Sequence, residues 1–199
     1  MFNLYRGIFM KKFVFVFAVL LCFSLSAYSQ NMVLGFSVGG GLPMGTFKDI
    51  SDFGFGGTAI FGYSVDPNIM LTGRAGYFSF SGKEITVFDE KFKTSYGIIP
   101  ILVGARYFFM PEGDTRVYGA AEIGLYSLTS KVKTTILDVT VEASTTESKF
   151  GFAPTLGAQF KAGDNLNVDV HVNYSYVATE GDALNWIGFG VGLEFGLGN

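Results

Sequence analysis

The chain has 199 residues, of which 49% are hydrophobic and 17% aromatic, and it contains 27 glycines. Its formal charge is −3 at pH 7, which argues against nucleic acid as a partner, because binding to phosphates requires a basic face. Cys22 is its single cysteine, which excludes an internal disulfide and a metal site built from several thiolates. We expect no metal and no cofactor.

The first 29 residues have the three parts of a secretory signal peptide. Met10–Lys12 opens a basic region, Phe13–Leu25 is largely apolar, and Ala27–Ser29 offers small residues before a cleavage site. We therefore expect residues 1–29 to be removed, with Met10 as an alternative start, leaving residues 30–199 as one domain. Three basic residues and no acidic one leave with this segment, so the remaining net charge is −6. The alternative is a retained N-terminal anchor helix.

From residue 32 onward, apolar residues alternate with polar or small ones in eight short runs. The predicted strands are Met32–Gly40, Phe55–Val65, Ile69–Phe80, Tyr96–Phe109, Arg116–Ser130, Phe150–Lys161, Leu166–Val177 and Asn185–Leu197. Each run meets the roughly 9–11 residues that a strand needs to cross a bilayer. The turns at 66–68, 111–114 and 163–165 are short and the other connections are longer. The sequence therefore predicts an all-β protein, an eight-stranded antiparallel up-and-down transmembrane β-barrel with both termini periplasmic.

The alternative architecture is a soluble barrel of lipocalin type, which has its apolar side chains inside. The charged residues decide between the two, because they share the polar face of their strands and leave the other face almost free of charge. An uncharged outer band suits hydrocarbon better than water. The residues predicted to face the lumen are Arg74, Arg106, Glu122, Lys161, Asp169, His171 and Glu194.

Charged side chains inside so narrow a barrel must pair, because an isolated buried charge is costly. We expect Arg74 and Arg106 to be the centres of a paired network, with Glu122 and Glu194 as partners, because the arginine fork suits carboxylates. Such a network would fill the lumen and make it rigid. A role in gating is the alternative interpretation.

His171, the single histidine, shares a face with Asp169. Acyl-transfer chemistry would also need a serine within hydrogen-bond reach, and no serine stands out as a nucleophile. We therefore predict no catalytic residue and no enzyme activity. The glycines at 39–41 and 188–192 do not lie between a strand and a helix, so they do not indicate a nucleotide site. On the inner face of a barrel, glycine makes room for large side chains from other strands.

Two strands contain an irregularity. Phe78 and Phe80 share the parity of Arg74, so the apolar face slips, and we expect either a bulge near Tyr77 or a strand end beyond the hydrocarbon. Pro100 removes a ladder donor, which predicts a bulge or a strand start there.

Two long excursions, 82–95 and 131–149, mix strand-forming residues with charge. We expect hairpins that project beyond the membrane. An exposed strand edge can pair with another chain, so these loops are the candidate contacts for a surface partner. The alternative is that they are solvated loops without a partner.

Four segments carry a family resemblance. They are the signal ending Ser26–Gln30, the opening Gly39–Gly45, the strand start Ile99–Leu102 and the glycine-alternating last strand. In these segments the chain resembles the outer-membrane β-barrel domain family of Bacteroidetes-type bacteria, near the small OmpA/OmpX-like barrels. The resemblance covers residues 31–199 and is architectural. It implies a protein of the cell outer membrane, in contact with outer-membrane lipid.

The last strand also resembles the signal that the barrel-assembly machinery reads. Gly190, Leu193 and Phe195 have the spacing Gly-x-x-Φ-x-Φ, where Φ is a large apolar residue. Gly192, Phe195 and Leu197 have the same spacing two residues later. Such barrels usually end on an aromatic residue, whereas this chain ends Gly198-Asn199, which leaves the register open.

The function that follows is an integral outer-membrane barrel with a structural or surface-interaction role and a lumen filled by side chains. The first alternative is a narrow pore for ions or small solutes. The second is a lipid-modifying outer-membrane enzyme, which would depend on His171.

Overall fold

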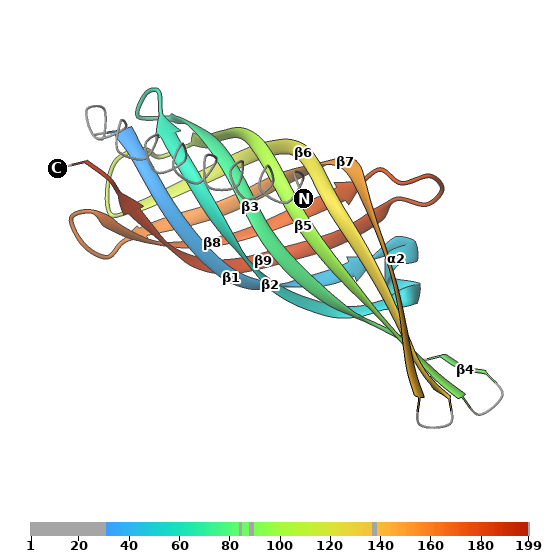
Figure 1. Cartoon of the computed structure of the whole chain (residues 1–199). Coiled ribbons are helices and arrows are strands. Elements are labelled where there is room, and N and C mark those ends of the chain that lie inside the picture. Colours follow the sequence, from blue (N-terminus) through green and yellow to red (C-terminus); the bar gives the residue numbers. More distant parts are fainter. Residues whose placement is uncertain (1–30, 84, 88–89, 137–138, 199) are drawn as a thin grey trace, which may run out of the picture.

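The computed structural model describes residues 31–83, 85–87, 90–136 and 139–198. The predicted signal peptide lies outside them. Within the described residues, eight long strands form one barrel (Figure 1). They are β1 (Met32–Met44), β2 (Ser51–Ser64), β3 (Ile69–Gly82), β5 (Glu90–Phe108), β6 (Thr115–Ile136), β7 (Val139–Lys161), β8 (Leu166–Val177) and β9 (Leu184–Gly196), with a short strand β4 (Ile85–Val87) and a helix α2 (Gly45–Ile50) between them.

Each long strand pairs antiparallel with the next long strand along the chain, and β1 pairs with β9 to close the barrel. The predicted eight-stranded antiparallel up-and-down barrel is therefore confirmed. The short β4 is not a strand of the barrel wall, because it pairs only with β5, beyond the point where β3 ends. In the described part of the chain, no helix has the length and apolarity to cross a membrane.

The two faces of the strands differ as the period-2 pattern predicts. Outward-facing apolar side chains are widely exposed, with 59% of Ile101 and 61% of Leu156 accessible. The alternate positions are closed off, and Arg106 and Glu122 expose 2% and 1%. Successive side chains of a strand point to opposite faces, so an apolar exterior requires a polar or small interior. This is the arrangement of a barrel in lipid rather than of a soluble barrel.

The three short turns lie together at one end of the barrel, which we call the short-turn end. In the first of them, the Asp66 carboxylate accepts hydrogen bonds from the backbone N–H groups of Asn68 (2.7 Å) and Ile69 (2.9 Å). This side-chain capping explains why the β2–β3 connection is tight. The chain termini of the barrel lie at the same end (Figure 1).

The opposite end, the long-loop end, carries a sheet that projects beyond the barrel (Figure 1). The predicted hairpins over 82–95 and 131–149 are confirmed as paired strands in their described residues, and they also pair with each other, since Ser95 lies opposite Lys131 and Lys131 opposite Ser144. We call the part formed by residues 85–87, 90–95, 131–136 and 139–149 the projecting sheet. Among the residues that the structure describes, none pairs as a strand with the outer edge of β7 before Gly151, where pairing with β8 begins.

The bulge expected near Tyr77 is wrong. The register of β3 against β2 runs through Tyr77 and Phe78 without a shift, and the only shift lies between the pairs of Ser51 and Gly54. Phe80 keeps the inward parity and is fully buried. The apolar residues at this end of β3 therefore fill the inside of the barrel mouth, and no slip is needed.

Pro100 does not begin a strand, because β5 starts at Glu90. It lies opposite Tyr126 of β6 in an unshifted register. On the other side, the ladder with β3 skips the positions of Ile99 and Pro100 and resumes in the same register. Proline has no backbone N–H to donate, and the sheet accommodates this by a local gap in the ladder with β3 rather than by a β-bulge.

The connection between the predicted strands Met32–Gly40 and Phe55–Val65 contains regular structure. β1 continues to Met44, and the helix α2 follows before β2 begins at Ser51. No side chain caps the start of this short helix, so its sequence carries no N-cap signal. Phe47 is its buried residue, and it points into the barrel mouth.

Candidate functional site

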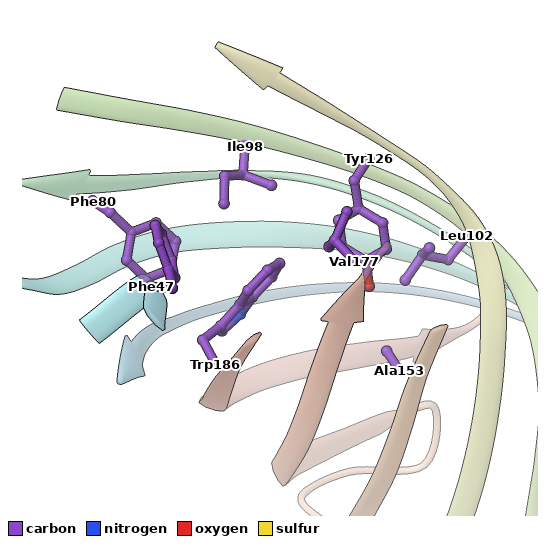
Figure 2. Packing of buried hydrophobic residues seen from close by; sticks show 8 residues of the cluster. All are labelled: Phe47, Phe80, Ile98, Leu102, Tyr126, Ala153, Val177 and Trp186. Atoms are coloured by element: carbon purple, nitrogen blue, oxygen red, sulfur yellow. The ribbon is translucent and has the colours of Figure 1, made fainter. Parts of the chain in front are cut away.

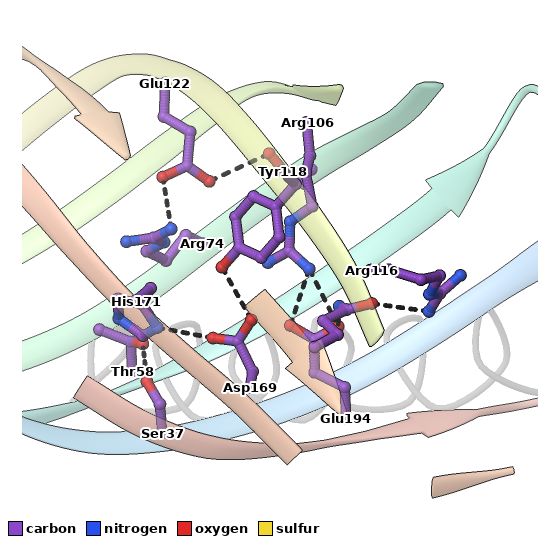
Figure 3. A network of polar contacts seen from close by, with 12 residues as sticks. Ser37, Thr58, Arg74, Arg106, Arg116, Tyr118, Glu122, Asp169, His171 and Glu194 are labelled. Atoms are coloured by element: carbon purple, nitrogen blue, oxygen red, sulfur yellow. Dashed lines mark hydrogen bonds and ion pairs between the residues drawn. The ribbon is translucent and has the colours of Figure 1, made fainter. Parts of the chain in front are cut away.

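The candidate site is the inside of the barrel, where charged side chains from five strands converge (Figure 3). Six of the seven ionisable residues predicted for the lumen lie there. They are Arg74, Arg106, Glu122, Asp169, His171 and Glu194, which we call the lumen charge network.

The Arg106 guanidinium on β5 is the most connected of these groups. Its Nη1 donates to both oxygens of Glu194 on β9, at 3.0 and 3.1 Å, and the pair is almost fully buried. The guanidinium also lies over the Tyr118 ring, 4.0 Å from its centroid. A cation held between a carboxylate and an aromatic face is stabilised from two sides.

Gln159 and Arg116 extend the cluster around Arg106 and Glu194 toward the short-turn end. The Gln159 amide donates to Glu194 at 2.5 Å and accepts from Arg116 Nη2 at 2.6 Å. Neither residue was predicted as a site residue. Gln159 is neutral, so the pattern of charged residues does not single it out. Arg116 is the first residue of its predicted strand, so the alternation of apolar and polar residues says little about which way its side chain points.

Arg74 forms the second ion pair, with its Nη2 2.9 Å from Glu122 Oε2. Thr72, two residues earlier on β3, donates to the other oxygen of Glu122 at 3.0 Å. Both members of the pair are buried, so removing either one would leave a charge without compensation.

Asp169 and His171 form the third group. The Tyr118 hydroxyl donates to Asp169 Oδ2 at 2.7 Å, and His171 Nδ1 lies 2.6 Å from Asp169 Oδ1. Among the described residues, no hydrogen bond joins His171 to a serine or threonine hydroxyl. Acyl transfer would need a hydroxyl nucleophile within hydrogen-bond reach of this pair.

Lys161 does not join this network. It ends β7 at the short-turn end, and its side chain is exposed. Its parity is that of an inward-facing residue, but parity gives only the face of a strand and not the height along the barrel axis. Lys161 lies where β7 ends, outside the closed interior.

Glycine makes room for these side chains at particular points. A Cβ atom on Gly157 would lie 2.4 Å from the ring of Tyr118, its cross-strand neighbour on β6. A Cβ atom on Gly190 would lie 2.8 Å from His171 Nε2, again from the paired strand. The space that glycine leaves is thus occupied by the neighbour across the ladder.

A cluster of aromatic residues closes the lumen at the long-loop end (Figure 2). Phe47 of α2 packs edge-on against Phe80, with ring centroids 5.1 Å apart, and Trp186 lies 5.7 Å from both Phe80 and Tyr126. All four are at most 1% exposed. We call this cluster the aromatic plug.

Little space remains between the plug and the charge network. The two cavities beside Arg74 have volumes of about 20 and 10 Å³. A cavity of that size holds about one water molecule. Among the described residues, no group of histidine, cysteine, aspartate or glutamate side chains is arranged to hold a metal ion.

The residues that resemble an assembly signal lie on the last strand, β9. Leu193 and Phe195 are 44% and 40% exposed on the apolar exterior, and Gly190 faces the lumen. The two large residues are therefore available to contacts outside the barrel.

An apolar exterior, a polar filled interior and eight antiparallel strands define the class of integral membrane β-barrels. The comparisons identify the family. Residues 15–195 match the outer membrane protein beta-barrel domain, so the chain belongs to that family and is a protein of the outer membrane. No curated protein matches the chain.

Solved barrels share the fold at low identity. OprG from Pseudomonas aeruginosa is 12% identical with a TM-score of 0.55, and the alignment covers 84% of this chain and 95% of OprG. Neisserial surface protein A is 13% identical with a TM-score of 0.52, covering 84% and 97%. The outer membrane protease OmpT from Escherichia coli is 9% identical with a TM-score of 0.50, also covering 84% and 97%. These likenesses show the fold alone.

Proposed function

We propose that this protein is a non-conducting outer-membrane barrel whose role is structural and whose projecting sheet contacts a partner at the cell surface. The observation that carries the proposal is the double closure of the lumen, by the charge network and by the aromatic plug. In this arrangement the short turns and both termini face the periplasm and the long loops face outward, because barrels of this kind have short periplasmic turns.

Single-channel conductance of the refolded protein in a planar bilayer tests the closed lumen. Migration that changes on heating before electrophoresis first establishes that the barrel has folded. We expect no stable openings in the wild-type protein. Steady openings whose conductance changes in Glu194→Ala would overturn the proposal and favour a narrow pore for ions or small solutes.

The free edge of β7 supports the surface role. The backbone N–H of Ala178 donates to the Phe150 carbonyl, so Phe150 turns its main-chain groups away from β6. Backbone groups alternate sides along an antiparallel strand. Thr146 and Ser148 therefore present their N–H and C=O groups to the unpaired edge, where a partner strand can add to the sheet.

Thr146→Pro tests this edge. It removes one outward donor, while the bonds between β7 and β6 come from the alternate residues and remain. Cells that produce this variant should attach to one another or to a solid surface less than cells producing wild-type protein or Thr146→Val, at equal amounts of folded surface barrel. Equal attachment by all three would remove the β7 edge from the proposal.

The barrel fold can carry an active site, as the protease OmpT does. We propose a non-enzymatic role for this chain, because His171 is held by Asp169 inside the network. Lipid-modifying activity that disappears in His171→Ala, with the barrel still folded, would overturn this part of the proposal. We also propose that residues 1–29 are a cleaved signal peptide and that Gly190, Leu193 and Phe195 are read by the barrel-assembly machinery.

A further inference from the structure

A larger cavity lies at the long-loop end, above the aromatic plug. Its volume is about 230 Å³, more than ten times that of either lumen cavity. It lies among β5, β6, β7, the helix α2 and the connection between β8 and β9. Its lining includes Phe47, Tyr96, Ile98, Leu128, Glu147 and Leu184.

The floor of this mouth cavity is apolar and closed. Phe47 and Ile98 are at most 1% exposed, and Leu128 and Leu184 pack against the buried cluster that contains both of them. Tyr96 packs edge-on against Phe47, with ring centroids 5.8 Å apart. A cavity of about 150 Å³ with apolar walls is known to take up a benzene ring. The mouth cavity therefore has room for one aromatic ring and a short chain.

The rim of the cavity is polar and acidic. Glu147 is on the rim with 58% of its side chain exposed. Lys149 bridges Glu147 (3.2 Å) and Glu180 of the β8–β9 connection (3.0 Å), so two carboxylates surround one ammonium group. The excess charge of this trio is negative. A cationic group at the rim is therefore favoured over an anionic one.

From the apolar floor and the acidic rim, we propose that the mouth cavity binds a small aromatic amine. The ring lies between Tyr96, Leu128 and Leu184, and the ammonium group donates to Glu147. This site is separate from the lumen charge network and from the β7 edge, so it goes beyond the proposed structural and surface role. It requires neither a conducting lumen nor a partner protein.

The probe is 2-phenylethylamine, compared with neutral 2-phenylethanol and anionic 3-phenylpropionate. Each is titrated by calorimetry into the barrel in lipid nanodiscs, with empty nanodiscs as the blank. We expect the amine to bind about tenfold more tightly than the acid, with the alcohol between them. The fluorescence of Trp186, the chain's single tryptophan, should change with the same affinity, because its ring lies 6.4 Å from that of Phe47.

Two pairs of variants locate the site. Leu128→Phe together with Leu184→Phe fills the floor and should abolish binding, whereas Leu125→Phe, on the apolar exterior of the same strand, should leave it unchanged. Glu147→Gln should weaken amine binding to the level of the alcohol, and Glu112→Gln, in a turn at the other end, should not. Heat-modifiable migration shows that each variant is folded.

The proposal is overturned if all three probes bind alike, or if none binds above the empty-nanodisc blank. It is equally overturned if the filled-floor variant binds the amine as the wild-type protein does, because the amine then binds elsewhere. Loss of binding in both the filled-floor variant and Leu125→Phe would also overturn it, since the effect would not come from the cavity.

Discussion

The lumen is closed twice, and the two closures are built differently. Toward the short-turn end, strand residues fill the barrel with paired charges, such as Arg106 with Glu194. Toward the long-loop end, the closure is aromatic, and one of its central residues, Phe47, comes from a helix in a connection. A charged closure depends on every partner being present, whereas an aromatic closure depends on shape and contact area. Substitutions should therefore affect the two regions unequally.

The largest effect is expected from Arg106→Ala. It leaves the Glu194 carboxylate buried without its cation, which should lower the free energy of unfolding by about 3–5 kcal/mol. Equilibrium unfolding in urea, with the barrel in lipid vesicles, measures the change. The double substitution Arg106→Met with Glu194→Leu is the control and should recover most of the loss. A loss below about 1 kcal/mol in Arg106→Ala would show that the pair does not hold the lumen together.

Phe47→Ala should have a somewhat smaller effect, about 3 kcal/mol, the lower end of the range for phenylalanine in a core. The site adjoins the mouth cavity, so water can enter the space that is left. The same unfolding measurement checks it, with Phe53→Ala, an exposed phenylalanine of β2, as the control. If Phe47→Ala lowered the free energy of unfolding more than Arg106→Ala does, the aromatic closure would stabilise the barrel more than the charged one, which is the opposite of what we expect.

Tyr118→Phe sharpens the comparison inside the charged region. It keeps the ring beneath Arg106 and removes only the hydroxyl that donates to Asp169. A buried hydrogen bond to a charged group contributes about 2 kcal/mol, so a loss of this size in unfolding free energy is expected. Tyr107→Phe, on the exposed exterior, serves as the control. No change in Tyr118→Phe would mean that His171 alone satisfies Asp169.

The smallest effect is expected at the rim, from Glu180→Gln. The Glu180 side chain is 95% exposed and its partner Lys149 still has Glu147, and an ion pair with so exposed a member contributes little. The urea midpoint should be the same as in the wild-type protein. Hydrogen exchange at residues 178–183 would be the sensitive measurement, and a shifted midpoint would show that this connection belongs to the cooperative fold.

Much of the barrel could be predicted from the sequence, because alternation reports the face of each residue directly. The strand Leu166–Val177 was predicted with the bounds that the structure shows, and the inward position of Arg106 and Glu122 followed from parity. Parity carries no height along the axis, so Lys161 was wrongly placed in the lumen. It also could not show that Phe80 fills the mouth.

The aromatic plug and the mouth cavity could not be predicted for a different reason. They depend on α2, a helix without a capping signal, and on contacts between Phe47 and Trp186, which are far apart in the sequence. The pairing of the two excursions with each other is likewise a tertiary contact. Local patterns predict elements, but they do not say which connections pack together.

The ladder between β1 and β9 has a consequence for how the molecule is made. Every other ladder of the barrel joins consecutive long strands, whereas this one brings Val33 beside Gly196 and Met44 beside Asn185. Joining distant segments costs more chain entropy than closing a hairpin, so this seam should form last. Until it forms, β1 and β9 are the two unpaired edge strands of an open sheet. Such edges can pair with strands of other chains, and they remain available until the last strand has been synthesised and the barrel closes.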